Sequence, residues 1–172
     1  KVTVEQLSTM KPVFIKEKGT VTAGNASSLN DGAAALVLME GGTVEKLGLT
    51  PMARLVGYAH AGVDPDYMGI GPIPAVRKVL ERTGISLDQI DVIEANEAFA
   101  AQACAVIQEL GLNPQLVNPN GSGISLGHPV GATGAIISTK AIYELQRIGG
   151  RYALVTMCIG GGQGIAAIFQ NV

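Results

Sequence analysis

The chain has 172 residues, of which only 15% are charged, and its formal net charge is −2. Because a typical soluble domain carries about 25% charged residues, we expect part of the surface to be covered by a partner or by another part of the protein. A weak negative charge and 4% aromatic residues provide neither the basic field nor the stacking surface that nucleic acid requires. No nucleic-acid partner is therefore expected.

The longest apolar runs of the sequence are residues 33–39 and 153–157. Both are far shorter than the ~20 residues of a membrane helix, so no membrane span is expected. The two cysteines, Cys104 and Cys158, are too few for a disulfide framework. A free Cys158 thiol requires a reducing compartment, which predicts the cytoplasm or an organelle matrix.

The first 48 residues are rich in small and polar side chains. Residues 1–22 predict a polar loop. Asn30 or Asp31 fits the N-cap of a short Ala-rich helix that leads into the apolar residues 35–39. Two glycines at 41–42 predict a break after it.

Strands and helices are predicted to alternate from Pro51 onward. Apolar residues recur at helical spacing in three segments, and the last two apolar segments flank a glycine turn that favours a hairpin. The expected order is strand 53–59, helix 74–83, strand 91–95, helix 98–110, a short strand near 116–119, helix 131–148, and strands 152–158 and 164–170. This order predicts an α/β fold with a mixed β-sheet and helices on both faces.

Three polar or reactive side chains follow predicted strands. Asn96 follows strand 91–95, His128 lies between a glycine and a proline, and Cys158 ends a strand just before three glycines. Because the carboxyl ends of strands line the ligand crevice in open α/β sheets, we expect these residues to converge there. The amides of residues 160–162 could form an oxyanion site.

Each of these residues also has a simpler interpretation. His128 fits a polar turn residue, Cys158 fits a packed apolar strand, and Asn96 fits a cap of the helix 98–110. Pairing an imidazole base with a thiol favours the catalytic interpretation. In that case a nearby His or a helix end is expected to lower the thiol pKa. Cys104, within the helix 98–110, is interpreted as a core residue.

Two other kinds of site match the sequence only in part. The glycines at 121–127 and 131–134 approach a dinucleotide-binding loop, but neither set has the full spacing and no acidic residue follows at the required distance. Zinc is the other option, although none of the spacings is typical of a finger. Its candidate ligands are His60, Cys104, His128 and Cys158.

Six motifs resemble those of the thiolases and occur in the same order, and they span most of the chain, from about residue 19 to 169. They are Thr-Ala-Gly-Asn-Ala-Ser at 22–27, Asn-Asp-Gly-Ala-Ala at 30–34, Met-Gly-Ile-Gly-Pro at 68–72, Glu-Ala-Asn-Glu-Ala-Phe-Ala at 94–100, Gly-His-Pro at 127–129 and Cys-Ile-Gly-Gly-Gly at 158–162. The sequence resembles only the later part of a thiolase, and is most similar to the acetyl-CoA acetyltransferase branch.

The resemblance implies a division of the chain into three segments. Residues 1–28 correspond to the tail of a loop domain, and residues 29–48 to a segment that returns to the N-terminal half. Residues 49–172 correspond to the C-terminal thiolase half, one layered unit. A homodimer or homotetramer is implied for the complete protein.

The resemblance also implies a role for several residues. His128 would activate a nucleophilic cysteine and hold the thioester oxygen, and Asn96 would position a water in the same oxyanion site. Cys158 would move the proton on the α-carbon, and the amide of Gly160 would serve the second oxyanion site. The pantetheine channel would be lined by Ala23, Ser27, Met68, Ala98 and Phe99.

The implied reaction is acyl transfer between coenzyme A thioesters. It joins two acetyl-CoA molecules into acetoacetyl-CoA, or runs in reverse as thiolysis, with acyl-CoA as substrate and no further cofactor. The alternatives are a degradative 3-ketoacyl-CoA thiolase and a non-catalytic assembly module. No residue of this chain corresponds to the cysteine that carries the acyl group in the family. The isolated chain is therefore expected to be inactive without the N-terminal half.

Overall fold

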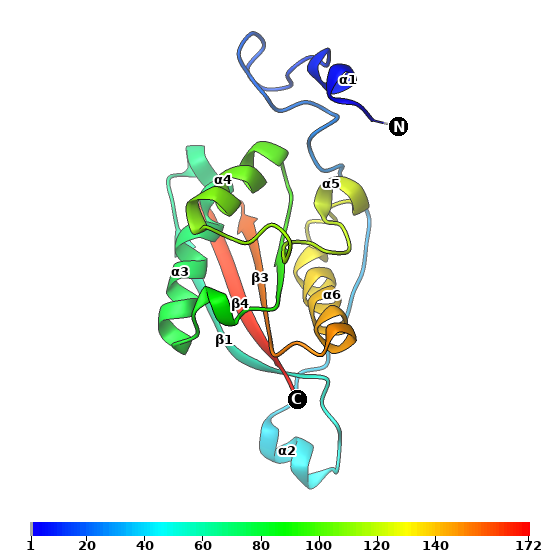
Figure 1. The fold of residues 1–172 in the computed structure, drawn as a ribbon, viewed down its shortest axis with the longest axis vertical. Helices are drawn as coiled ribbons and strands as arrows, with labels where there is room; N and C mark the ends of the chain where they lie inside the picture. Colours follow the sequence, from blue (N-terminus) through cyan, green and yellow to red (C-terminus); the bar gives the residue numbers. More distant parts are fainter. Residues whose placement is uncertain (1) are drawn as a thin grey trace.

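The computed structural model describes residues 2–172. Within them, four strands form one mixed sheet in the order β1-β4-β3-β2 (Figure 1). The sheet is antiparallel except where β2 pairs with β3, which confirms the predicted mixed sheet. The strands are β1 (Ala53–Gly62), β2 (Val92–Ala95), β3 (Tyr152–Ile159) and β4 (Gln163–Asn171).

Helices cover both faces of this sheet. The helices α3 (Pro72–Thr83) and α4 (Ala100–Leu110) lie on one side, and α6 (Thr133–Ile148) lies on the other (Figure 1). This arrangement confirms the predicted α/β layers. The shorter elements are α1 (Val4–Ser8), α2 (Gly41–Lys46), η1 (Pro65–Ile70), η2 (Leu87–Gln89) and α5 (Gly123–Leu126).

The alternation of side chains along β3 divides the core between the two faces. Leu154 packs in the cluster that contains Val76 and Val79 of α3. Its neighbours Ala153 and Val155 pack in the cluster formed with α6. Both faces of β3 are therefore buried, which explains why the strand is largely apolar. Its buried Thr156 hydroxyl donates to the Ile165 carbonyl over 2.8 Å.

The predicted helix 98–110 and the predicted strand near 116–119 differ from the structure. The helix α4 begins at Ala100 rather than at residue 98, because Phe99 is extended and forms an isolated bridge with Ala26. Asn96 therefore does not cap this helix. The strand predicted near 116–119 is also wrong, since the structure has only a parallel bridge between Val117 and Ile93 there.

Cys104 is exposed, so its interpretation as a core residue was wrong. The buried residues of α4 are Gln102 and Val106. Cys104 lies two positions from each, which is about 200° around the helix and places it on the outer face.

Residues 2–48, the N-terminal arm, contain little regular structure. The helix predicted to lead into residues 35–39 is wrong, because residues 31–40 form no regular element and are exposed. An all-apolar run offers no polar face for a surface helix. The predicted break at 41–42 is instead the start of α2, where the Glu40 carboxylate accepts hydrogen bonds from the Gly42 and Thr43 amides.

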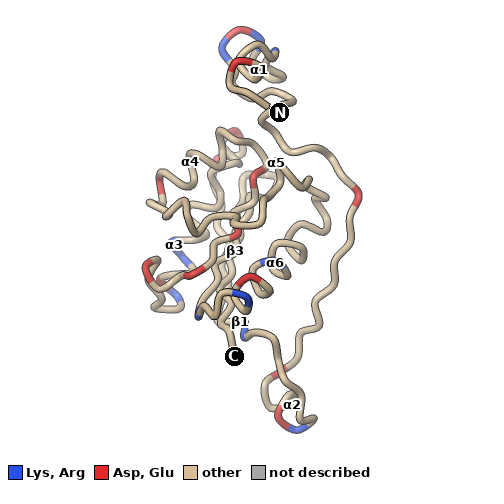
Figure 2. Tube along the Cα trace, turned by 45° about the vertical axis from the view of Figure 1, so that its right-hand side comes forward, with Lys and Arg blue, Asp and Glu red and all other residues tan. Residues whose placement is uncertain are grey.

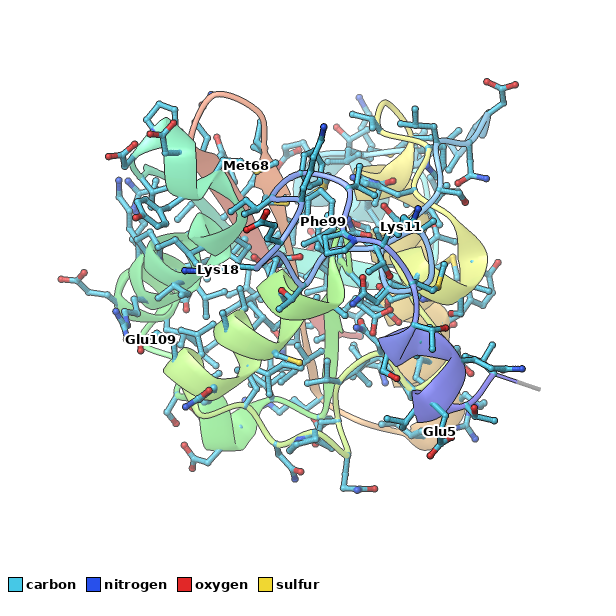
Figure 3. All side chains as sticks on the ribbon, turned by 90° about the horizontal axis from the view of Figure 1, so that it is seen from above. Glu5, Lys11, Lys18, Met68, Phe99 and Glu109 are labelled. Carbon is cyan, nitrogen blue, oxygen red and sulfur yellow. The ribbon has the colours of Figure 1, made fainter. Side chains whose placement is uncertain are left out.

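The arm spans the length of the packed domain (residues 49–172). Its long segment before α2 carries little charge and runs outside the layers (Figure 2). At the other end, the Phe14 and Phe99 rings meet edge to face with centroids 6.0 Å apart. The loop that carries Lys11 and Lys18 thus crosses over the start of α4 (Figure 3).

Candidate active site

Two of the predicted site residues lie at one edge of the sheet. Because β2 and β3 are parallel, their carboxyl ends share this edge. Asn96 directly follows β2, and its backbone amide donates to the Thr156 carbonyl over 3.0 Å. Cys158 lies at the end of β3. The predicted placement of both residues at this edge is therefore confirmed.

The Asn96 side chain is buried beside the loop that carries His128. Asn96 is 3% exposed, and within residues 2–172 its Nδ2 atom has no hydrogen-bond partner. Asn96 lines a cavity of about 20 Å³ together with Gly127, Pro129 and Thr133. A cavity of this size has room for about one water molecule.

The His128 ring is oriented by Thr133. Its Nδ1 atom lies 2.7 Å from the Thr133 hydroxyl oxygen. That hydroxyl donates its single proton to the Pro129 carbonyl over 2.9 Å, so it can only accept from the ring. Nδ1 then carries the proton in the neutral imidazole, and Nε2 is left as a proton acceptor. Burial also lowers the pKa of His128, which favours the neutral, basic form.

The arm contributes to this site through Asn30. The Asn30 Oδ1 atom accepts a hydrogen bond from the His128 amide over 3.0 Å, and Leu29 forms a parallel bridge with His128. A side chain at Gly127 would bring its Cβ 2.5 Å from Asn30 Oδ1, and Gly127 has φ 102°. Asn30 therefore holds the loop that carries His128 and is not the helix cap that was predicted.

Thr133 and Asn30 were not identified as site residues from the sequence. Thr133 lies five positions after His128 in a helical first turn, where a hydroxyl can reach back toward the loop. That spacing was a usable signal. Asn30 lies 98 residues from His128, and no local pattern links the two.

Cys158 differs from expectation in its ionisation. The residue is 5% exposed, and burial raises the pKa of its thiol. The prediction of a lowered pKa was wrong for this chain, because the burial outweighs the backbone hydrogen bond that favours the thiolate. At neutral pH Cys158 is a thiol and can donate a proton.

The pairing of His128 with Cys158 stays a prediction. Alternation along β3 places Cys158 on the same face as Leu154, which packs against α3. His128 lies instead near the start of α6, on the other face. The two groups can therefore meet only beyond the carboxyl edge of the sheet.

The glycine turn after Cys158 makes close backbone contacts. The Gly162 carbonyl accepts from the Val63 amide over 2.7 Å, and a Cβ at Gly162 would lie 2.4 Å from the Val63 oxygen. Gly160 is exposed at the start of the turn. Its predicted use as an oxyanion donor is untested.

The predicted channel residues gather where the arm meets α4. The Ser27 amide donates to the Ala98 carbonyl over 2.9 Å, and Phe99 directly precedes α4. Figure 3, seen from this end, shows Met68 and Phe99 on the side crossed by the arm. Ala23 belongs to the same loop of the arm. Their contact with pantetheine stays a prediction.

Two further observations concern other kinds of site. Residues 2–172 contain no group of three or more His, Cys, Asp or Glu side chains that could hold a metal ion. In the same range, no helix has both the length and the apolar character needed to cross a membrane.

Comparison with known proteins shows the family. The thiolase C-terminal domain matches residues 49–171, and the thiolase N-terminal domain matches residues 1–42. The beta-ketothiolase BktB of Cupriavidus necator is 67% identical over 170 residues, which are 99% of this chain and 43% of that protein. This chain belongs to the thiolase family.

Solved structures agree with this assignment. The acetyl-CoA acetyltransferase of Bacillus anthracis superposes with a TM-score of 0.96 at 52% identity. Human mitochondrial 3-ketoacyl-CoA thiolase in complex with CoA superposes with a TM-score of 0.92 at 47% identity. Each match covers 100% of this chain and 43% of the other. The chain thus spans less than half the length of the relatives that it matches.

Proposed function

We propose that this chain supplies the second portion of a thiolase that transfers acyl groups between coenzyme A thioesters. The observation that carries the proposal is the buried side-chain amide nitrogen of Asn96, which has no hydrogen-bond partner among the described residues, in a residue that lines a water-sized cavity beside the His128 loop. A water held there and the His128 ring would form one site for a thioester oxygen. Preorganised donors of this kind stabilise an enolate that is far more basic than any side chain.

The chemistry divides between this chain and a portion that it lacks. His128, neutral and with Nε2 free to accept a proton, would activate the nucleophilic cysteine of the other portion. Cys158 begins as a thiol, so it would first give its proton to the leaving coenzyme A sulfur. The resulting thiolate would then take the α-proton of the second thioester. The Gly160 amide would serve the second oxyanion site.

The particular thioester is proposed from the relatives. The acetyl-CoA acetyltransferase similarity favours condensation of two acetyl-CoA molecules and the reverse thiolysis. The similarity to 3-ketoacyl-CoA thiolases favours other 3-ketoacyl-CoA substrates as the second candidate. Comparing acetoacetyl-CoA with 3-ketovaleryl-CoA in the same assay distinguishes them.

The partners and compartment are proposed on the same grounds. The complete protein would work as a homodimer or homotetramer, with its first portion and a second copy covering the exposed apolar surface. The relatives include bacterial enzymes and a mitochondrial one, so we propose the cytoplasm or an organelle matrix.

The test joins this chain to the first portion of the Cupriavidus necator relative. Thiolysis of acetoacetyl-CoA by coenzyme A is followed as loss of the substrate's enolate absorbance. The fused protein is expected to turn over, whereas the chain alone is not. Turnover by the chain alone, or a folded fusion that is inactive on both substrates, would overturn the proposal.

A further inference from the structure

Asn118 extends the pairing of β2 at the point where the main chain can no longer do so. Val117 forms a parallel bridge with Ile93, and the Asn118 amide donates to the Ile93 carbonyl over 2.8 Å. At Asn118 the chain then turns away with φ 51°, the one positive φ among the described non-glycine residues. The backbone after it therefore leaves β2.

The Asn118 side chain takes over the pairing from the backbone. Its Oδ1 atom accepts from the Ala95 amide over 2.9 Å, and its Nδ2 atom donates to the Ala95 carbonyl over 2.8 Å. These two bonds satisfy both polar groups of the residue directly before Asn96. Ala95 is itself buried, at 7% exposure, so its amide, whose acceptor is Asn118 Oδ1, would be costly to leave unpaired. The Ala95 carbonyl also accepts from the Ser122 hydroxyl over 3.3 Å.

Only asparagine meets all the demands of this position. The turn requires a residue that tolerates the left-handed region, which asparagine does better than other side chains. Pairing with Ala95 requires one donor and one acceptor on a short side chain. Aspartate lacks the donor, and glycine tolerates the turn but lacks the amide.

We propose that Asn118 is a positioning residue for Asn96. By bonding the Ala95 N–H and the Ala95 C=O, Asn118 holds the two peptide groups that flank the Ala95 Cα atom. This sets where the Asn96 side chain lies relative to the cavity beside His128. This inference rests on the proposed function, because the value of that position depends on Asn96 holding a catalytic water. The contact with Ala95 itself does not depend on it.

The first measurement uses the isolated chain and needs no activity. Asn118→Gly keeps the turn accessible and removes both side-chain hydrogen bonds. Amide hydrogen exchange at Ala95 is expected to speed up about tenfold or more, since its acceptor is lost. Asn113→Gly is the matched control, because among residues 2–172 the Asn113 side chain bonds only to the nearby Gln115 amide. Unchanged exchange at Ala95 in Asn118→Gly would contradict the inference.

The second measurement uses the fused, complete protein and compares two partial reactions. Under the proposed function, exchange of the α-protons of acetyl-CoA would depend on the oxyanion site of Asn96, whereas acyl exchange between thioesters would depend on the second oxyanion site, at Gly160. Asn118→Gly is expected to slow α-proton exchange about 10- to 100-fold, because a shift of about 1 Å in a catalytic group has effects of that size. Acyl exchange is expected to change less than about twofold when rates are given per folded protein.

The outcomes separate the two proposals. If Asn118→Gly slows both partial reactions equally, Asn118 only supports the fold and the positioning role is wrong. The rate of α-proton exchange in Asn118→Asp is expected to lie between those of the unsubstituted protein and Asn118→Gly, since aspartate keeps the acceptor for the Ala95 amide. If the unsubstituted fusion catalyses neither reaction, the proposed function fails. The Ala95 exchange result then still decides whether Asn118 holds this peptide.

Discussion

The packed domain and the N-terminal arm belong to one chain but obtain their shapes in different ways. The packed domain has two clusters of buried apolar side chains, one on each face of its sheet. In the arm, Thr22 is the one buried residue among those that the structure describes. Large apolar side chains there are exposed instead, with Leu29 at 93% and Val37 at 91%.

This difference explains the low charge of the sequence. An apolar run that is exposed on one fragment is typical of a surface that another part of a protein covers. Under the proposed function, the first portion of the thiolase covers residues 29–39. The arm therefore contributes contacts rather than a core. It contacts the candidate site through Leu29 and Asn30, next to His128.

The largest expected contrast between the two regions is in how much the free energy of unfolding falls when an apolar side chain is shortened to alanine. Leu154 is completely buried in the cluster with α3, so Leu154→Ala should lower the free energy of unfolding by about 3 kcal/mol. Val37→Ala, in the arm, should change it by less than about 0.5 kcal/mol. Urea denaturation of the isolated chain measures both. Similar losses would mean that the arm folds together with the domain.

A second contrast compares a buried ion pair with an exposed one inside the packed domain. The Lys140 Nζ atom lies 2.8 Å from Glu94 Oε2, and Glu94 is fully buried. Lys140 also donates to the Gly121 carbonyl, so it joins the end of β2 to the loop before His128. Lys140→Met leaves Glu94 as an unpaired buried charge and should destabilise the domain by about 3 kcal/mol.

The exposed pair and the pH provide the controls. Arg77 and Glu109 form a pair whose side chains are each 58% exposed, so Arg77→Met should lower the free energy of unfolding by less than about 1 kcal/mol.

The pH dependence of the Lys140→Met defect follows from the pKa of Glu94. Burial raises the pKa of Glu94, against the opposing effect of Lys140. A raised carboxyl pKa stabilises the fold below the unfolded value of 4.5 and loses that effect as pH rises. The Lys140→Met defect should therefore shrink as pH falls toward 4.5, and a pH-independent defect would contradict this.

The fold could be predicted from the sequence where one element buries one apolar face. The helix α6 and the hairpin of β3 and β4 were found because their patterns are local. Residues 35–39 were misassigned because an apolar run does not reveal whether its own chain covers it. Strand 116–119 failed for another reason, since the Asn118 side chain replaces the backbone there.

The site could be predicted only in part, because some of its features depend on residues that are far apart in the sequence. Asn96 follows β2 and Cys158 lies at the end of β3, so topology placed them at one edge of the sheet. Burial depends on all neighbours, and it raised the Cys158 pKa where the sequence suggested a lowered one. The contact between Asn30 and His128 could not be predicted without knowing the path of the arm, because the two residues lie 98 positions apart.

A third prediction tests the point where the arm meets the site. Asn30→Ala removes the acceptor of the His128 amide, which should lower stability by about 1 kcal/mol. The NMR signals of His128 and Gly127 should shift strongly as the loop loses its tether. Asn113→Ala, which breaks a bond to a near neighbour in sequence, should leave those signals unchanged. If Asn30→Ala also leaves them unchanged, the arm does not hold the loop.

The smallest expected effect on global stability concerns the cap of α2 in the arm. Glu40 caps this six-residue helix, which has no buried residue, and hydrogen bonds from Gly42 and Thr43 lower the pKa of the Glu40 carboxyl. A lowered pKa favours the cap above the unfolded value of 4.5 and loses that effect as pH falls. Glu40→Ala, or acidification, should therefore unfold α2 locally, seen as carbonyl chemical shifts of residues 41–46 moving to coil values.

Such a short helix is marginal without tertiary contacts, so its loss should leave the unfolding transition of the packed domain unchanged. The matched change is Ser86→Ala at the N-cap of η2 within the packed domain, which removes the hydrogen bond from the Ser86 hydroxyl to Gln89 Oε1 and should lower global stability by about 0.5 kcal/mol. A cap stabilises the whole fold only where its helix is part of the cooperative unit. A shift of the global transition in Glu40→Ala would place α2 inside that unit and would remove the distinction between arm and domain.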